Sequence, residues 1–178
     1  MAHGRTHNKA NAVLTIAVGA AGLVTGLPAD QSLALALGVA TGFLVNPDLD
    51  VEGGSIAFDN ARRTAGGLFA FAWRLLWLPY ARFIPHRSFW SHAPILGTAG
   101  RVIYLGLLAW PAWPFIPWGV ILPWLMPALL GLALSDLVHW ILDMKTFKIF
   151  QLWWRGVFWF AVLPMLLGLL AWWLLIGR

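Results

Sequence analysis

Hydrophobic residues occur along this chain in long runs that short polar segments separate. Such runs predict membrane-spanning helices, because about 20 consecutive apolar residues cross the hydrocarbon core of a bilayer. Prolines and polar residues mark the ends of most runs. The pattern predicts an all-α integral membrane protein with about five transmembrane helices in a single membrane domain, residues 1–178. The expected spans are approximately residues 11–27, 32–46, 93–110, 119–142 and 156–176.

Two parts of this pattern allow alternatives. The first two runs are short, so a helical hairpin that dips partway into the bilayer is an alternative to two complete spans. The segment 65–83 is rich in aromatic residues but also carries Arg74 and Arg82. It predicts an interfacial amphipathic helix on the membrane surface. A spanning helix interrupted by Arg74 is the less favoured alternative.

Composition supports the membrane class. Hydrophobic residues make up 60% of the chain and charged residues only 11%, whereas soluble domains contain about 25% charged residues. The formal charge of +5 does not indicate a nucleic-acid partner, because the cations are spread along the chain. They are absent from the connections 28–31 and 111–118. By the positive-inside rule these connections face outward and the N-terminus is cytoplasmic.

Candidate metal ligands all fall on the predicted cytoplasmic side. The chain contains no cysteine, so a metal site has to use His, Asp or Glu. His139 and Asp143 are neighbours on one helix face because four residues separate them. A hydrogen bond between them at a helix end is an equally simple explanation of that spacing. The candidate ligands are His7, Asp48, Asp50, His86, His92, His139 and Asp143.

These seven residues are more ligands than one tetrahedral ion can bind. The sequence therefore predicts a site for one or two divalent metal ions. Two cations can clamp a phosphoryl or acyl oxygen and lower the pKa of a bound water. Nitrogen and oxygen ligands without sulfur suit Zn, Mn or Fe, and the sequence does not choose among them. Asp50, His86 and Arg87 are the candidate catalytic residues. Arg87 either neutralises a phosphate head group or only helps to set the topology.

Four motifs carry a resemblance to known families: GRTHNKAN near the start, PDLD, LPYARFIPHRSFWSHAPILGTAGR, and a late HxxxD. The chain resembles a family of uncharacterised bacterial metal-binding membrane proteins. More distantly, it is similar to the LexA-regulated, inner-membrane, metal-dependent hydrolases. The resemblance implies metal-site roles for the seven candidate ligands, whereas His3 has no counterpart in it.

The expected function is a metal-dependent hydrolase of the inner membrane. It would act at the cytoplasmic interface on a lipid or a lipid-linked phosphate ester, with membrane lipids as its partners. Non-enzymatic metal binding or transport is the alternative, and a scaffold with a structural metal is a third possibility. Arg101 and Asp136 are charges within predicted spans at similar depths, so we expect them to pair beneath the metal site.

Overall fold

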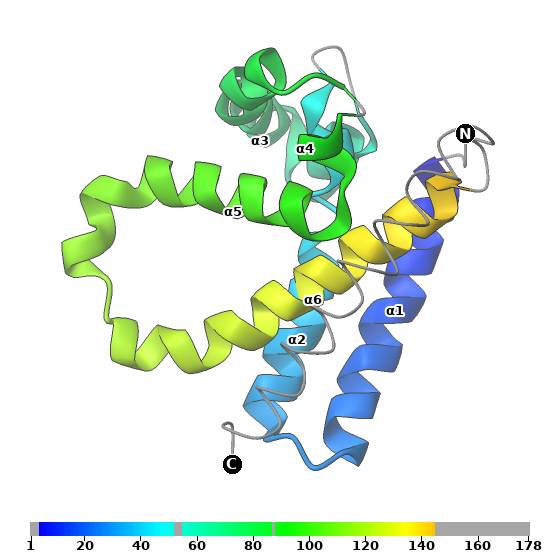
Figure 1. Ribbon diagram of the computed structural model, residues 1–178, viewed down its shortest axis with the longest axis vertical. Helices are drawn as coiled ribbons and strands as arrows, with labels where there is room; N and C mark the ends of the chain where they lie inside the picture. The colour runs from blue at the N-terminus through cyan, green and yellow to red at the C-terminus, as the bar shows by residue number, and fades with distance from the viewer. Residues whose placement is uncertain (1–3, 52–54, 87, 145–178) are drawn as a thin grey trace.

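A computed structural model describes residues 4–51, 55–86 and 88–144, which form an all-α structure (Figure 1). The predicted span 156–176 lies outside these residues, as do His3 and Arg87. In chain order the elements are α1 (Gly4–Val24), α2 (Ala29–Thr41), η1 (Pro47–Asp50), α3 (Ile56–Phe83), α4 (Phe89–His92), α5 (Pro94–Ala109), η2 (Trp110–Phe115) and α6 (Trp118–Met144). The two η elements are short 3₁₀ helices.

Helix α2 packs against both α1 and α6, and glycines allow the closest approach (Figure 1). A Cβ atom added to Gly38 would lie 2.0 Å from the carbonyl oxygen of Ala128. One added to Gly131 would lie 2.1 Å from the carbonyl oxygen of Leu35. The backbones of α2 and α6 are therefore in direct contact, a packing mode that small residues permit between apolar helices.

Helices α5 and α6 diverge from the middle of the structure and are joined at their far ends through η2 (Figure 1). Among the described residues, the segments Pro94–Phe115 and Trp118–Asp143 are long and apolar enough to cross a membrane. They correspond to the predicted spans 93–110 and 119–142. The other predicted spans are not shown by this criterion and stay predictions.

The helices that contain the first two predicted spans have different bounds from those spans. Helix α1 begins at Gly4 instead of residue 11, because the polar residues before the apolar run continue the same helix. Helix α2 ends at Thr41 instead of residue 46 and has 13 residues. Such a helix is about 20 Å long, shorter than the hydrocarbon core of about 30 Å. A hairpin that enters the bilayer only partway therefore remains compatible with these helices.

Helix α3 begins at Ile56, earlier than the predicted segment 65–83, and bends at Gly66, whose φ is 85°. Beyond the bend, Trp77 and Tyr80 are buried in the main hydrophobic core. This core also contains residues of η1 and α6 and therefore lies beside the polar end of the helices. The opposite face of α3 exposes leucine and phenylalanine side chains. Its location at a membrane surface stays a prediction.

The close approach of α2 and α6 leads to a test. We expect Gly131→Ala to lower the free energy of unfolding by about 1–3 kcal/mol, because the new methyl group has to push the α2 backbone away. Gly119→Ala is the matched control on α6, since no atom lies within 4 Å of its added Cβ. Thermal and denaturant unfolding in detergent will measure both variants. Equal stability of the two would contradict the direct backbone contact.

Candidate metal centre

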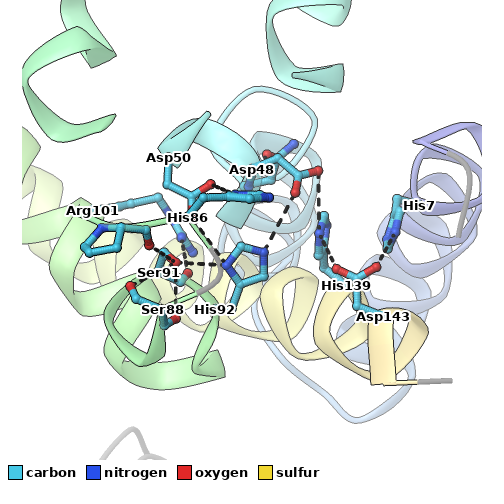
Figure 2. Close-up of polar contacts among 12 residues, drawn as sticks. His7, Asp48, Asp50, His86, Ser88, Ser91, His92, Arg101, His139 and Asp143 are labelled. Atoms are coloured by element: carbon cyan, nitrogen blue, oxygen red, sulfur yellow. Dashed lines mark hydrogen bonds and ion pairs between the residues drawn. The ribbon is translucent and has the colours of Figure 1, made fainter. Parts of the chain in front are cut away.

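Four segments that are distant in sequence bring all seven candidate ligands together in one cluster (Figure 2). One lies in the first turns of α1, two lie in η1, two lie just before α5, and two lie in the last turns of α6. These residues are, in the same order, His7; Asp48 and Asp50; His86 and His92; His139 and Asp143. The residues that the sequence predicted to lie on one side of the membrane therefore form a cluster in the structure.

The turn that carries the two central carboxylates is built by local chemistry. The side-chain oxygen of Asn46 accepts a hydrogen bond from the backbone N–H of Asp48 at 3.1 Å and so caps η1. Pro47 occupies the first turn, where its fixed φ suits the start of a helix. The side chain of Asp48 is 27% exposed, whereas that of Asp50 is fully buried. Asp48 is therefore the more accessible of the two carboxylates in this turn.

Helices α1 and α6 are joined beside the site by paired polar groups. The hydroxyl of Ser135 donates to the side-chain oxygen of Asn11 at 2.7 Å. The rings of His7 and His139 stack with centroids 4.0 Å apart. Nε2 of His7 lies 3.1 Å from Oδ1 of Asp143. The first turns of α1, which the sequence left outside the first span, are thus an integral part of the cluster.

The seven side chains form a continuous series in which imidazoles and carboxylates alternate. Each carboxylate lies between two histidines (Figure 2). In spatial order the series is His7, Asp143, His139, Asp48, His92, Asp50 and His86.

Distances in the middle of this series fit ligands of a shared ion better than direct hydrogen bonds. Nε2 of His139 lies 3.4 Å from Oδ2 of Asp143 and 3.7 Å from Oδ2 of Asp48. Nε2 of His92 lies 3.8 Å from Oδ1 of Asp48. Two atoms that each lie about 2.1 Å from a tetrahedral ion are about 3.4 Å apart, whereas hydrogen bonds from nitrogen to oxygen are usually about 2.7–3.2 Å long.

Buried nitrogen atoms also support a fit to a metal. Nε2 of His139 is buried and has no hydrogen-bond partner among the described residues, a costly state unless another group satisfies it. Within the part of the chain that the structure describes, two groups of three residues have ligand atoms within 4.8 Å of one another: His7, His139 and Asp143; and Asp48, His92 and His139. Neutral imidazole and carboxylate are suitable donors for Zn, Mn or Fe, so the donor set fits a divalent metal.

The far end of the series has a different geometry. Nδ1 of His86 lies only 2.7 Å from Oδ1 of Asp50, which is a direct hydrogen bond. Nδ1 of His92 lies 3.5 Å from the other oxygen of Asp50 and 2.9 Å from the Ser91 hydroxyl. Neither Asp50 nor His86 belongs to the two groups of ligand atoms. The geometry therefore supports Asp50 as the group that orients these two imidazoles.

The same histidines lower the pKa values of the two carboxyl groups of η1. Burial raises the pKa of Asp48, but His139 and His92 lower it by more, so that it lies below its ordinary value. Burial likewise raises the pKa of Asp50, and His92, His86 and Ser91 together bring it below that value. Both carboxylates are therefore ionised near neutral pH and available as acceptors or ligands.

The predicted pairing of Arg101 with Asp136 is confirmed. The Arg101 guanidinium donates to Oδ2 of Asp136, and both side chains are almost completely buried. The hydroxyl of Thr98 donates to the same oxygen. The sequence did not predict the hydrogen bonds that Ser91 forms with His92 and Thr98 with Asp136. Serine and threonine are common in apolar helices, and their positions in the sequence do not indicate which residue they contact.

Comparisons with known proteins identify a family. A sequence model of the family described as "uncharacterized metal-binding protein (DUF2227)" matches residues 2–125. No curated protein and no solved structure matches the chain significantly. The expected resemblance to metal-binding proteins is thus confirmed, whereas the more distant resemblance to hydrolases stays a prediction. The matched region ends before the two ligand candidates of α6, which the structure adds to the cluster.

The lowered pKa values of Asp48 and Asp50 lead to a test on the metal-free protein. As the pH falls through about 4, the unfolded chain takes up protons before the folded one does. Stability is therefore highest above that pH and is lost below it. We expect the melting temperature, measured with a chelator in detergent between pH 6 and 3, to fall less steeply for Asp50→Asn. Asp59→Asn, at an exposed position, should retain the wild-type slope, and equal slopes for all three proteins would contradict the assignment.

Proposed function

We propose that this chain, which belongs to the uncharacterized metal-binding protein family (DUF2227), is a membrane-embedded, metal-dependent hydrolase. Its substrate class is a lipid or a lipid-linked phosphate ester, and the reaction takes place at the cytoplasmic face of the bacterial inner membrane. The observation that carries the proposal is the partly exposed Asp48 between two imidazoles, one facing each of its oxygens.

The residues that would hold metal are those whose ligand atoms gather around Asp48 and Asp143. One oxygen of Asp48 faces His139 and the other faces His92, an arrangement suited to a carboxylate that bridges two ions. His7 and Asp143 complete the group on the α1 side. When bound, such ions polarise a phosphoryl oxygen and activate a water for attack.

The hydrogen-bonded pair of His86 and Asp50 supports a role in proton transfer. An ionised carboxylate only accepts hydrogen bonds, so Nδ1 of His86 donates to Asp50 and Nε2 is left as the basic nitrogen. The side chain of His86 is 41% exposed, whereas that of Asp50 is fully buried. Asp50 thus orients an accessible imidazole that can take or give a proton at Nε2.

Two observations support a membrane interface as the place of reaction. The candidate centre lies beside the start of α5 and the last turns of α6 (Figure 1), which are long and apolar enough to cross a membrane by the criterion applied to the described residues. Arg5 and Lys9 on α1 and Arg62 and Arg63 on α3 are exposed near that end. Such cations favour the cytoplasmic side, and a site at this depth is accessible to the head group of a lipid.

The metal content of the purified protein is the first test. We expect about two divalent ions per chain by elemental analysis, and about one or fewer in Asp48→Asn, because the amide cannot bridge two cations as a carboxylate does. Asp59→Asn is the matched control and should retain the wild-type content. Wild-type protein without stoichiometric metal would contradict the centre, and an unchanged content in Asp48→Asn would contradict the bridge.

Hydrolysis is tested separately from metal binding. We expect the metal-loaded protein to hydrolyse diacylglycerol phosphate or polyprenyl phosphate in micelles, with release of inorganic phosphate and the lipid alcohol. His86→Ala should lower kcat by about 10²–10⁴-fold, the usual contribution of a general acid or base, with metal content retained. Metal binding without release from any of these lipids would contradict the hydrolase and favour a non-enzymatic metal-binding protein.

A further inference from the structure

Arg101 is completely buried on α5, and its guanidinium is shared between two separate segments of the chain. One terminal nitrogen, Nη2, donates to Oδ2 of Asp136 on α6. The other, Nη1, donates to the backbone carbonyl oxygen of Ser91 in α4 at 3.0 Å. Because a guanidinium is planar and rigid, these two contacts fix the positions of α4 and α6 relative to each other.

Each contact of Arg101 lies next to a candidate metal ligand. Ser91 immediately precedes His92, and Asp136 lies three residues before His139 on the same helix face. The rings of these two histidines have centroids 6.3 Å apart and approach Asp48 from different sides. Figure 2 shows Arg101 reaching from α5 toward the segment that carries Ser91 and His92.

The segment that carries His92 has little rigidity of its own. Helix α4 has only four residues, which is far below the length at which a helix is stable in isolation. It rests on α5 at Gly97, where an added Cβ would lie 2.4 Å from the carbonyl oxygen of Ser91. The placement of His92 therefore depends on this close contact and on the hydrogen bond from Arg101.

We propose that Arg101, held by Asp136, is a positioning residue that sets the separation of His92 and His139 in the metal centre. A buried ion pair is weak as a source of net stability, because desolvation of the two charges offsets their attraction. The hydrogen bonds of this pair are nevertheless directional, so they restrict the relative positions of the segments they join more strictly than an apolar contact does. The inference rests on the proposed metal centre but does not depend on hydrolysis.

The test separates positioning from stability by replacing the whole pair. Removal of one partner would leave a buried unpaired charge, whereas the double variant Arg101→Met with Asp136→Leu replaces both charges by apolar groups of similar size. We expect this variant to fold with a melting temperature close to that of the wild type. Its affinity for Co²⁺ should be about 10–100-fold lower, as when a group that orients a ligand is lost. The visible absorption of the bound Co²⁺ should also change.

Two single variants make the result independent of the folding of the double variant. Arg101→Lys retains a positive charge beside Asp136 but lacks the second guanidinium nitrogen, which donates to the Ser91 carbonyl. Its affinity for Co²⁺ should also be about 10-fold lower than that of the wild type. Gly97→Ala leaves the ion pair in place and displaces the Ser91 carbonyl, with the same expected loss. Tyr104→Phe is the control, because it removes another hydrogen bond of α5, donated by the Tyr104 hydroxyl to the carbonyl of Leu76. That variant should bind Co²⁺ as the wild type does.

The possible outcomes distinguish the positioning role of Arg101 from the proposed metal centre on which it rests. Wild-type Co²⁺ affinity and absorption in a folded double variant or in Arg101→Lys would overturn the positioning role. A loss of affinity in Tyr104→Phe equal to that in Arg101→Lys would also overturn it, because the effect would then be a general one of α5 stability. Wild-type protein that does not bind Co²⁺, Zn²⁺, Mn²⁺ or Fe²⁺ would contradict the metal centre itself.

Discussion

The contact between the backbones of α2 and α6 is the constraint on which the rest of the structure depends. Glycines at Gly38 and Gly131 let the two helices touch without intervening side chains. Helix α2 is followed by η1 in the chain, and with α2 and α6 in contact, His139 in the last turns of α6 lies 3.7 Å from Asp48 of η1. The carboxylates of η1 can then face His139, and α1 completes the group because it packs against both helices.

Polar groups beside the candidate centre are buried in an otherwise apolar chain, and each needs a partner to offset its desolvation. Asn11 donates to the carbonyl of Val39 and accepts from Ser135. The side chains of Asn8 and Asn60 form a reciprocal pair. These bonds join α1 to its neighbours in one specific register, which apolar packing alone would specify less strictly. They also explain how the polar start of α1 can be ordered.

The helical class and the candidate ligands were predictable because they depend on local features. Run length and hydropathy indicated the segments that became α5 and α6. The predicted topology placed every candidate ligand on the same side, because successive spans alternate in direction. Boundaries were less predictable: α1 extends into a polar segment, and α2 ends before Asn46, because tertiary hydrogen bonds and the cap of η1 override the hydrophobic pattern.

The sequence by itself determined the chemistry available to this protein: imidazoles and carboxylates without thiols, next to apolar runs, two of which form helices long and apolar enough to cross a membrane among the described residues. Only the tertiary structure decided which of these groups lie together as candidate metal ligands and which form a hydrogen-bonded pair. It gathers His7, His92, His139 and their carboxylates within reach of an ion, and it joins His86 to Asp50 by a direct hydrogen bond. The physical reason is that coordination and hydrogen bonding differ by less than 1 Å in the separation of two atoms, and such distances are set by how helices from distant parts of the chain pack together.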